Sequence, residues 1–139
     1  MIDALLKHSG DKAAPELCLQ KSVWLRALKK YAEADALAAD CLEKNPKLNV
    51  RMQADLLAVR AGCRLDQEDW AGAYELYGKI DPKMRSPYLI DMAAAAMALG
   101  KYREVETMLD EVVKRGRTGQ RLYGSALNHL KKLNAGRGE

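Results

Sequence analysis

The chain has 139 residues, of which 48% are hydrophobic and 30% are charged, which indicates one folded domain and excludes a disordered chain. The longest apolar run, residues 92–99, is too short to span a membrane, no secretory signal is evident, and three widely spaced cysteines argue against a disulfide framework. The formal net charge of +4 is uneven, since residues 112–138 carry seven basic side chains and no acidic one.

Helical periodicity begins early in the chain. The N-terminal segment, residues 1–14, contains Ile2, Leu5 and Leu6, which either pack on the next helix or fray. Apolar residues at helical spacing then predict three helices, over residues 15–28, 50–65 and 89–99. Each is followed by a turn and a second helix. The middle turn, residues 66–69, is expected to be about two residues longer than the others.

The second helices share a pattern. Each has an aromatic residue at its start, and the three aromatics are Tyr31, Trp70 and Tyr102. A smaller residue follows three positions later, and these residues are Ala34, Ala73 and Val105. The aromatics are 39 and 32 residues apart, and a helical repeat with a period in the thirties is typical of a helical solenoid. We expect the aromatics to be largely buried.

Local signals place the third helix pair. Ser86 can cap a helix, Pro87 suits the first helical position, and Gly100 suits a left-handed turn residue. In the first pair, by contrast, Lys29 occupies the turn position. The alanines of residues 93–96 allow close packing of a neighbouring helix.

A last helix is predicted from residue 119 to 133, with Thr118 as its cap and a short tail over residues 135–139. Its apolar residues lie along one stripe, namely Leu122, Tyr123, Ala126, Leu127, Leu130 and Leu133. Arg121, Lys131 and Lys132 lie mostly off this stripe and form a basic outer face. That face either attracts an acidic partner or is a solvated helix end, where the helix dipole favours cations. No nucleic-acid motif accompanies the charge, so nucleic acid is not an expected partner.

These features resemble the tetratricopeptide repeat family, with three repeats over residues 15–116. The third repeat is the most similar, through Leu99, Gly100, Tyr102 and Leu109, whereas the first has Lys29 where the family has a turn glycine. The resemblance implies one all-α domain, a right-handed superhelical solenoid of three helix pairs, with residues 117–134 as a capping helix. An ordinary α-helical bundle is the alternative.

The resemblance also implies a concave groove lined by the first helix of each pair. Its predicted residues are Leu19, Val23, Arg26, Leu56, Arg60, Ile90, Ala94 and Met97. Such a groove suits an apolar or amphipathic peptide with some acidic character. The alternative is that many of these side chains fill the interior. The basic clamp with which relatives bind acidic chaperone tails is absent, because Leu19, Val23, Pro87 and Asp91 occupy its positions.

No catalytic, cofactor or metal motif is evident. His8 and His129 lack partners at metal-ligand spacing, the glycines form no phosphate loop, and no serine lies in a nucleophile elbow. The cysteines lie in apolar helical stretches without a CxxC pair, which predicts buried, unreactive thiols. We therefore expect a protein that is not an enzyme and binds neither a metal nor a cofactor.

The expected function is a cytoplasmic protein–protein interaction module that acts as a scaffold or assembly subunit. The alternative is a chaperone similar to the small bacterial type III secretion chaperones, which hold an aggregation-prone secreted subunit. The length and the apolar groove agree with that alternative, but the basic C-terminal part departs from those usually acidic proteins. A third possibility is one domain of a longer protein.

Overall fold

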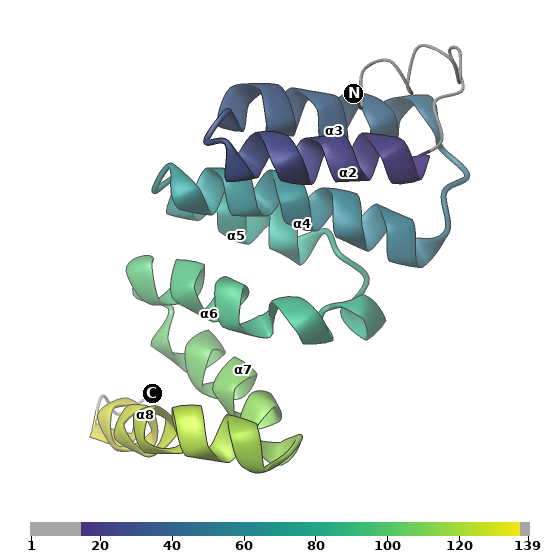
Figure 1. Ribbon diagram of the computed structural model, residues 1–139. Helices are drawn as coiled ribbons and strands as arrows, with labels where there is room; N and C mark the ends of the chain where they lie inside the picture. Colours follow the sequence, from purple (N-terminus) through teal and green to yellow (C-terminus); the bar gives the residue numbers. More distant parts are fainter. Residues whose placement is uncertain (1–14, 137–139) are drawn as a thin grey trace. The chain divides into compact units, whose positions relative to one another are not determined.

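The computed structural model describes residues 15–136, and all regular structure in that range is helical (Figure 1). The predicted all-α class is therefore confirmed. The α-helices are α2 (Pro15–Ala27), α3 (Tyr31–Lys44), α4 (Val50–Asp66), α5 (Trp70–Gly78), α6 (Leu89–Ala98), α7 (Tyr102–Lys114) and α8 (Arg117–Gly136). Two short 3-10 helices, η2 (Pro82–Met84) and η3 (Ser86–Tyr88), connect α5 to α6. Ile2, Leu5 and Leu6 lie outside the described residues.

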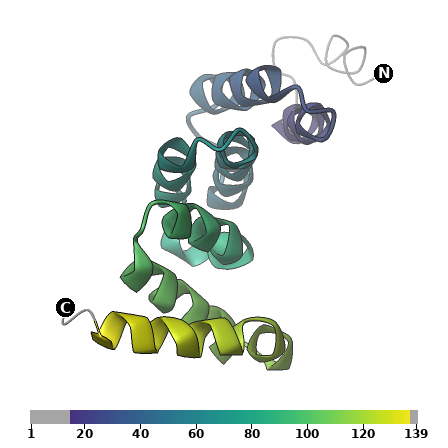
Figure 2. The ribbon, with the colours of Figure 1, turned by 90° about the vertical axis from the view of Figure 1, so that its left-hand side faces the viewer.

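The chain divides after Arg85 into two compact units. In the first unit, α4 packs against α2, α3 and α5. In the second unit, α7 packs against both α6 and α8. Figure 2 shows the later part of α8, in yellow, along its length and the first turns of the same helix end-on, so α8 bends. Helix α7 packs beside it.

Three helical hairpins, α2–α3, α4–α5 and α6–α7, share one turn. Its central residue is left-handed each time, with φ of 64° at Lys29, 62° at Glu68 and 75° at Gly100. The N–H of that residue donates to the carbonyl three positions earlier, and the next N–H donates to the carbonyl five positions earlier. This is the Schellman arrangement, which satisfies the last carbonyls of the first helix.

The prediction of a longer middle turn is wrong. Helix α4 continues to Asp66, and Gln67, Glu68 and Asp69 complete a turn of the same length as the other two. The backbone hydrogen bonds of the turn form with glutamate at the left-handed position as they do with glycine. Equivalent positions in the three hairpins are therefore those counted from Tyr31, Trp70 and Tyr102.

Small residues recur where the two helices of each hairpin pack together. The first helices place buried residues at equivalent positions, which are Ser22, Ala61 and Ala93. The second helices do the same with Ala34, Ala73 and Val105, the small residues of the sequence pattern. The Ser22 hydroxyl donates to the Cys18 carbonyl at 2.8 Å, so its polar group is satisfied inside the core.

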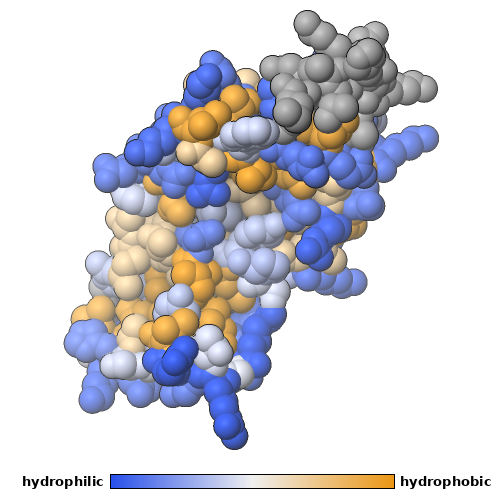
Figure 3. Space-filling model, in the orientation of Figure 1, coloured by the Kyte–Doolittle hydropathy of each residue, from blue (hydrophilic) through white to orange (hydrophobic). Residues whose placement is uncertain are grey.

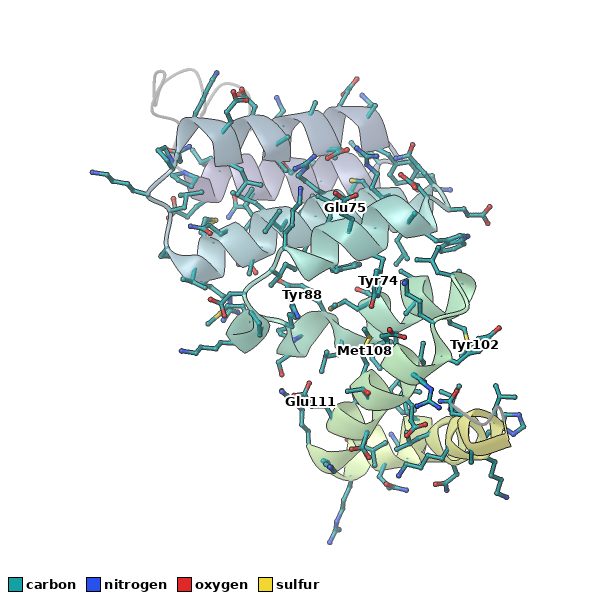
Figure 4. All side chains as sticks on the ribbon, turned by 180° about the vertical axis from the view of Figure 1, so that it is seen from behind. Tyr74, Glu75, Tyr88, Tyr102, Met108 and Glu111 are labelled. Carbon is teal, nitrogen blue, oxygen red and sulfur yellow. The ribbon has the colours of Figure 1, made fainter. Side chains whose placement is uncertain are left out.

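The aromatic residues at the starts of α3, α5 and α7 are less buried than predicted. Tyr31, Trp70 and Tyr102 are all partly exposed. Figure 4 labels Tyr102 at the start of α7. The residue three positions later, and not the aromatic, is the one that is fully buried in each hairpin.

The core of the first unit contains all three cysteines. Cys18 and Cys41 form one cluster with Ala38 and Leu56, and Cys63 belongs to a second cluster. All three are buried free thiols, as predicted. Burial first, and then the neighbouring Cys18, raises the pKa of the Cys41 thiol to about 12.

Helix α6 begins at Leu89, as predicted, but without a side-chain cap. Ser86 and Pro87 belong to the 3-10 helix η3, so they are not the cap and first residue of α6. Helix α8 begins at Arg117, so Thr118 lies inside it and is not its cap. Asn49 does act as a cap, because its side chain accepts from the Met52 N–H at 2.8 Å.

Candidate protein-binding surfaces

The residues predicted to line a groove are divided between the two units. Leu19, Val23, Arg26, Leu56 and Arg60 belong to the first unit, and Ile90, Ala94 and Met97 belong to the second. Apolar side chains reach the surface over the helices of both units, among charged ones (Figure 3).

Helix α2 presents an open apolar surface, but only one predicted residue takes part in it. Val23 is 50% exposed, and its neighbour Trp24 is 53% exposed. Leu28, in the turn after α2, is also exposed. Leu19 instead packs against both core clusters of the first unit. Trp24 was not among the predicted surface residues. The equivalent residue of the next hairpin, Cys63, is buried in the core, so the hairpin pattern does not indicate that Trp24 is exposed.

The groove prediction is wrong for Leu56, which is fully buried between α2, α3 and α4. The error follows from the mispredicted turn between α4 and α5. A turn with two extra residues places the expected groove positions of α4 two residues too early in the sequence. The residues of α4 equivalent to Leu19 and Val23 are Ala58 and Gly62, and both are buried. At these positions α4 therefore contributes small residues instead of a leucine and an arginine.

The side chain of Arg26 extends over α4 and is paired there, so it is not free to bind a partner. Its Nε donates to Asp66 Oδ2 at 2.8 Å, and that hydrogen bond raises the pKa of the guanidinium. A methyl group at Gly62 would approach Arg26 Cζ to 2.5 Å, so glycine makes room for this crossing. The pair links α2 to α4 and neutralises the charge predicted to attract an acidic partner.

Arg60 faces α3 and belongs to a different surface. Its Nε donates to Asp35 Oδ1 at 2.7 Å, while Arg64 Nε donates to the other oxygen, Oδ2, at 3.0 Å. Arg64 also reaches Asp69 at 3.1 Å, and Asp69 accepts the Gly72 N–H at the start of α5. Arg60 was expected to line the groove, and in the structure its side chain connects α4 to α3 through Asp35.

An open pocket of about 440 Å³ lies beside this ion-pair network. Ala32, Ala36 and Ala39 of α3 form one wall, and Arg60 and Arg64 of α4 form another. The hydrogen bonds with Asp69 and then Asp35 raise the pKa of Arg64. Arg60 pairs with the same Asp35 carboxylate. The network joins α3, α4 and the α4–α5 turn, so its charged side chains hold the helices of the first unit together.

Helix α6 offers the apolar surface of the second unit. Met97 is 42% exposed and Ala94 is exposed, whereas Ile90 is partly buried. The opposite side of α6 carries the buried Met92, Ala93 and Ala96. In this unit the prediction agrees with the exposure of Ala94 and Met97.

Helix α8 differs from the predicted cap with a polar outside. Leu127 and Leu130 are buried, but Leu122 and Leu133 are 57% and 43% exposed. Arg121, Lys131 and Lys132 are all exposed, as predicted. Lys131 also lies 3.7 Å from Asp110 of α7, whose pKa is lowered by Lys114 and, to a smaller extent, by Lys131.

Side chains that could bind a metal ion do not cluster on the described surfaces. Over residues 15–136, no set of three or more histidine, cysteine, aspartate or glutamate side chains is arranged to hold a metal ion. His129 is exposed on α8, and His8 lies outside the described residues. In the same range no helix has both the length and the apolarity to cross a membrane.

Comparisons of the chain with protein-family models, with curated proteins and with solved structures give no match.

Proposed function

We propose that this protein is a non-catalytic interaction module, built as a tetratricopeptide-like right-handed solenoid of three helix pairs with α8 as its cap. The observation that carries the proposal is the repeated hairpin. Three hairpins share one turn geometry, and each buries a small residue at the same two positions. Helix pairs that repeat in this way stack into solenoids, whose first helices line a binding surface.

The partner that we infer is a peptide or helical segment with an apolar face. Val23 on α2 and Met97 on α6 lie eight and five residues before the aromatic of their hairpin, which is a difference of about one helical turn, and both are exposed. Arg26 and Arg60 are already paired with Asp66 and Asp35, so they add little net positive charge. Apolar contact, and not acidity, is therefore the main requirement for this surface.

The biological role that we propose is a scaffold or assembly subunit in the cytoplasm. The three buried free thiols suit a reducing compartment. The alternative role, a secretion chaperone, requires the same apolar surface. The two roles differ in the state of the partner, which is folded in the first and aggregation-prone in the second.

The test is affinity purification from the source cells with the double variant Val23→Asp, Met97→Asp. Both side chains are exposed, so the variant should fold, whereas Leu19→Asp would put a charge against the core. Val50→Asp is the matched control, because Val50 is 43% exposed at the start of α4. We expect the double variant to lose a partner that the wild type and the control retain.

The retained partner then distinguishes the roles. A scaffold should copurify with proteins that are soluble and folded by themselves. A chaperone should copurify with one client that precipitates when it is expressed alone. If the wild type, the double variant and the control retain the same proteins, the first-helix surface is not the binding site.

A further inference from the structure

We propose that the pocket beside the ion-pair network is a second docking site, which receives a tyrosine side chain of a partner protein. The pocket has a volume of about 440 Å³. Its lining residues are Ala32, Asp35, Ala36, Ala39, Arg60, Arg64, Gln67 and Asp69, and we call it the α3–α4 pocket. This inference goes beyond the proposed function, because it concerns another surface and another kind of recognised group.

One wall of the α3–α4 pocket is made of alanines. Ala32, Ala36 and Ala39 are four and three residues apart, so they lie on one side of α3. Ala32 and Ala36 are exposed, and Ala39 is partly exposed. The wall is therefore apolar and can be reached from solvent by a flat ring.

Another wall contains two guanidinium groups that are bonded through their edges. Arg60 Nε donates to Asp35 Oδ1 at 2.7 Å, and Arg64 Nε donates to Asp35 Oδ2 at 3.0 Å. Arg64 also donates to Asp69 at 3.1 Å. These bonds hold both groups in place without using their planar faces, and an aromatic ring can stack on such a face.

Charge and hydrogen bonding select a neutral ligand with a polar tip. The two arginines are balanced by Asp35 and Asp69, so the lining has no net charge and attracts neither an anion nor a cation strongly. Within residues 15–136, Arg60 donates a hydrogen bond only through Nε, so its terminal nitrogens can donate to a ligand. A tyrosine supplies a ring for the alanines and guanidiniums and a hydroxyl oxygen that accepts.

The experiment titrates the full chain with three neutral probes and follows the backbone amide signals by NMR. The probes are N-acetyltyrosinamide, N-acetylphenylalaninamide and N-acetylleucinamide. We expect the tyrosine probe to bind with a Kd on the order of 1 mM and to shift the amide signals of residues 32–39. Binding should be weaker by about threefold for the phenylalanine probe, which lacks the hydroxyl, and by about tenfold for the leucine probe.

Protein variants locate the binding. Ala36→Leu should weaken binding of the tyrosine probe by at least about tenfold, because the larger side chain occupies the pocket. Ala71→Leu is the matched control, since Ala71 is exposed on α5 and does not line the pocket. Arg60→Lys keeps the charge beside Asp35 but removes the planar group, so it should weaken binding by about threefold to tenfold. The amide spectrum of each variant also reports whether the chain remains folded.

Three results would overturn the proposal. The first is equal affinity for the tyrosine and leucine probes, and the second is tyrosine binding that Ala36→Leu leaves intact. The third is a set of signal changes centred on Val23 or Met97, which would place the probe on the first-helix surface instead. No variant in this experiment changes Val23 or Met97, so its failure leaves the proposed function to its own test.

Discussion

Lys29 and Glu68 adopt left-handed backbone conformations that favour glycine, while Gly100 occupies the same position in the third hairpin. We expect Lys29→Gly and Glu68→Gly each to raise the free energy of unfolding by about 0.5 kcal/mol, because glycine relieves the steric cost. Gly100→Ala should lower it by about 1 kcal/mol. Urea unfolding measures all three. Destabilisation by both glycine variants would contradict the left-handed turn.

The Cys63 thiol makes stability sensitive to alkaline pH. Burial raises its pKa from 9.0 to about 11, so the folded state favours the neutral thiol. Its contribution to stability is fully present below pH 9 and is lost as the pH rises through about 11. We expect the stability difference between the wild type and Cys63→Ala to shrink by on the order of 1 kcal/mol per pH unit in that window.

Urea unfolding of both proteins at several pH values measures this difference. Cys63→Ala also leaves a small cavity, but the cavity cost does not depend on pH and is removed by the comparison. A stability difference that stays constant from pH 8 to the alkaline limit would show that the thiol ionises equally in both states.

At the scale of elements, the hairpins depend on small residues more than on their aromatics. Ala73 of α5 is fully buried, and Ala71 on the same helix is exposed. We expect Ala73→Leu to lower the free energy of unfolding by about 1–3 kcal/mol, because the added atoms separate the packed helices. Ala71→Leu, the control, should change it by less than about 0.5 kcal/mol. Equal effects in urea unfolding would contradict this packing.

The sequence predicts these hairpins well because their pattern is local. The aromatic, the small residue three positions later and the apolar periodicity lie within one helix, and helix bounds such as Pro15–Ala27 follow closely from them. The middle turn was mispredicted because neither Gln67 nor Glu68 signals a turn as Gly100 does. That two-residue error assigned Leu56 and Arg60 to the groove.

Helix α8 shows a different limit of prediction. Periodicity identifies the apolar residues, but it does not show how many neighbours cover them. Only α7 packs extensively on α8 within the second unit, so Leu127 and Leu130 are buried while Leu122 and Leu133 remain exposed. Ion pairs such as Lys131 with Asp110 depend on the same packing and have no local signal in the sequence.

At the scale of the whole molecule, the chain divides into two compact units. Leu127 is buried between α7 and α8, and we expect Leu127→Ala to destabilise the second unit by about 2–4 kcal/mol through the cavity that it leaves. Amide hydrogen exchange should show reduced protection in α6, α7 and α8. Helices α2 to α5 serve as the internal reference. An equal loss of protection in both units would mean that they unfold as one.

The division after Arg85 also determines which part of the protein tryptophan fluorescence monitors. Both tryptophans of the chain, Trp24 and Trp70, precede the division. Trp24 is 53% exposed, and Trp70 is partly buried. Tryptophan emission is therefore a spectroscopic signal of the first unit alone, with one indole accessible to a soluble quencher and the other more protected. The second unit contributes no emission when the excitation wavelength is long enough to excite tryptophan but not tyrosine.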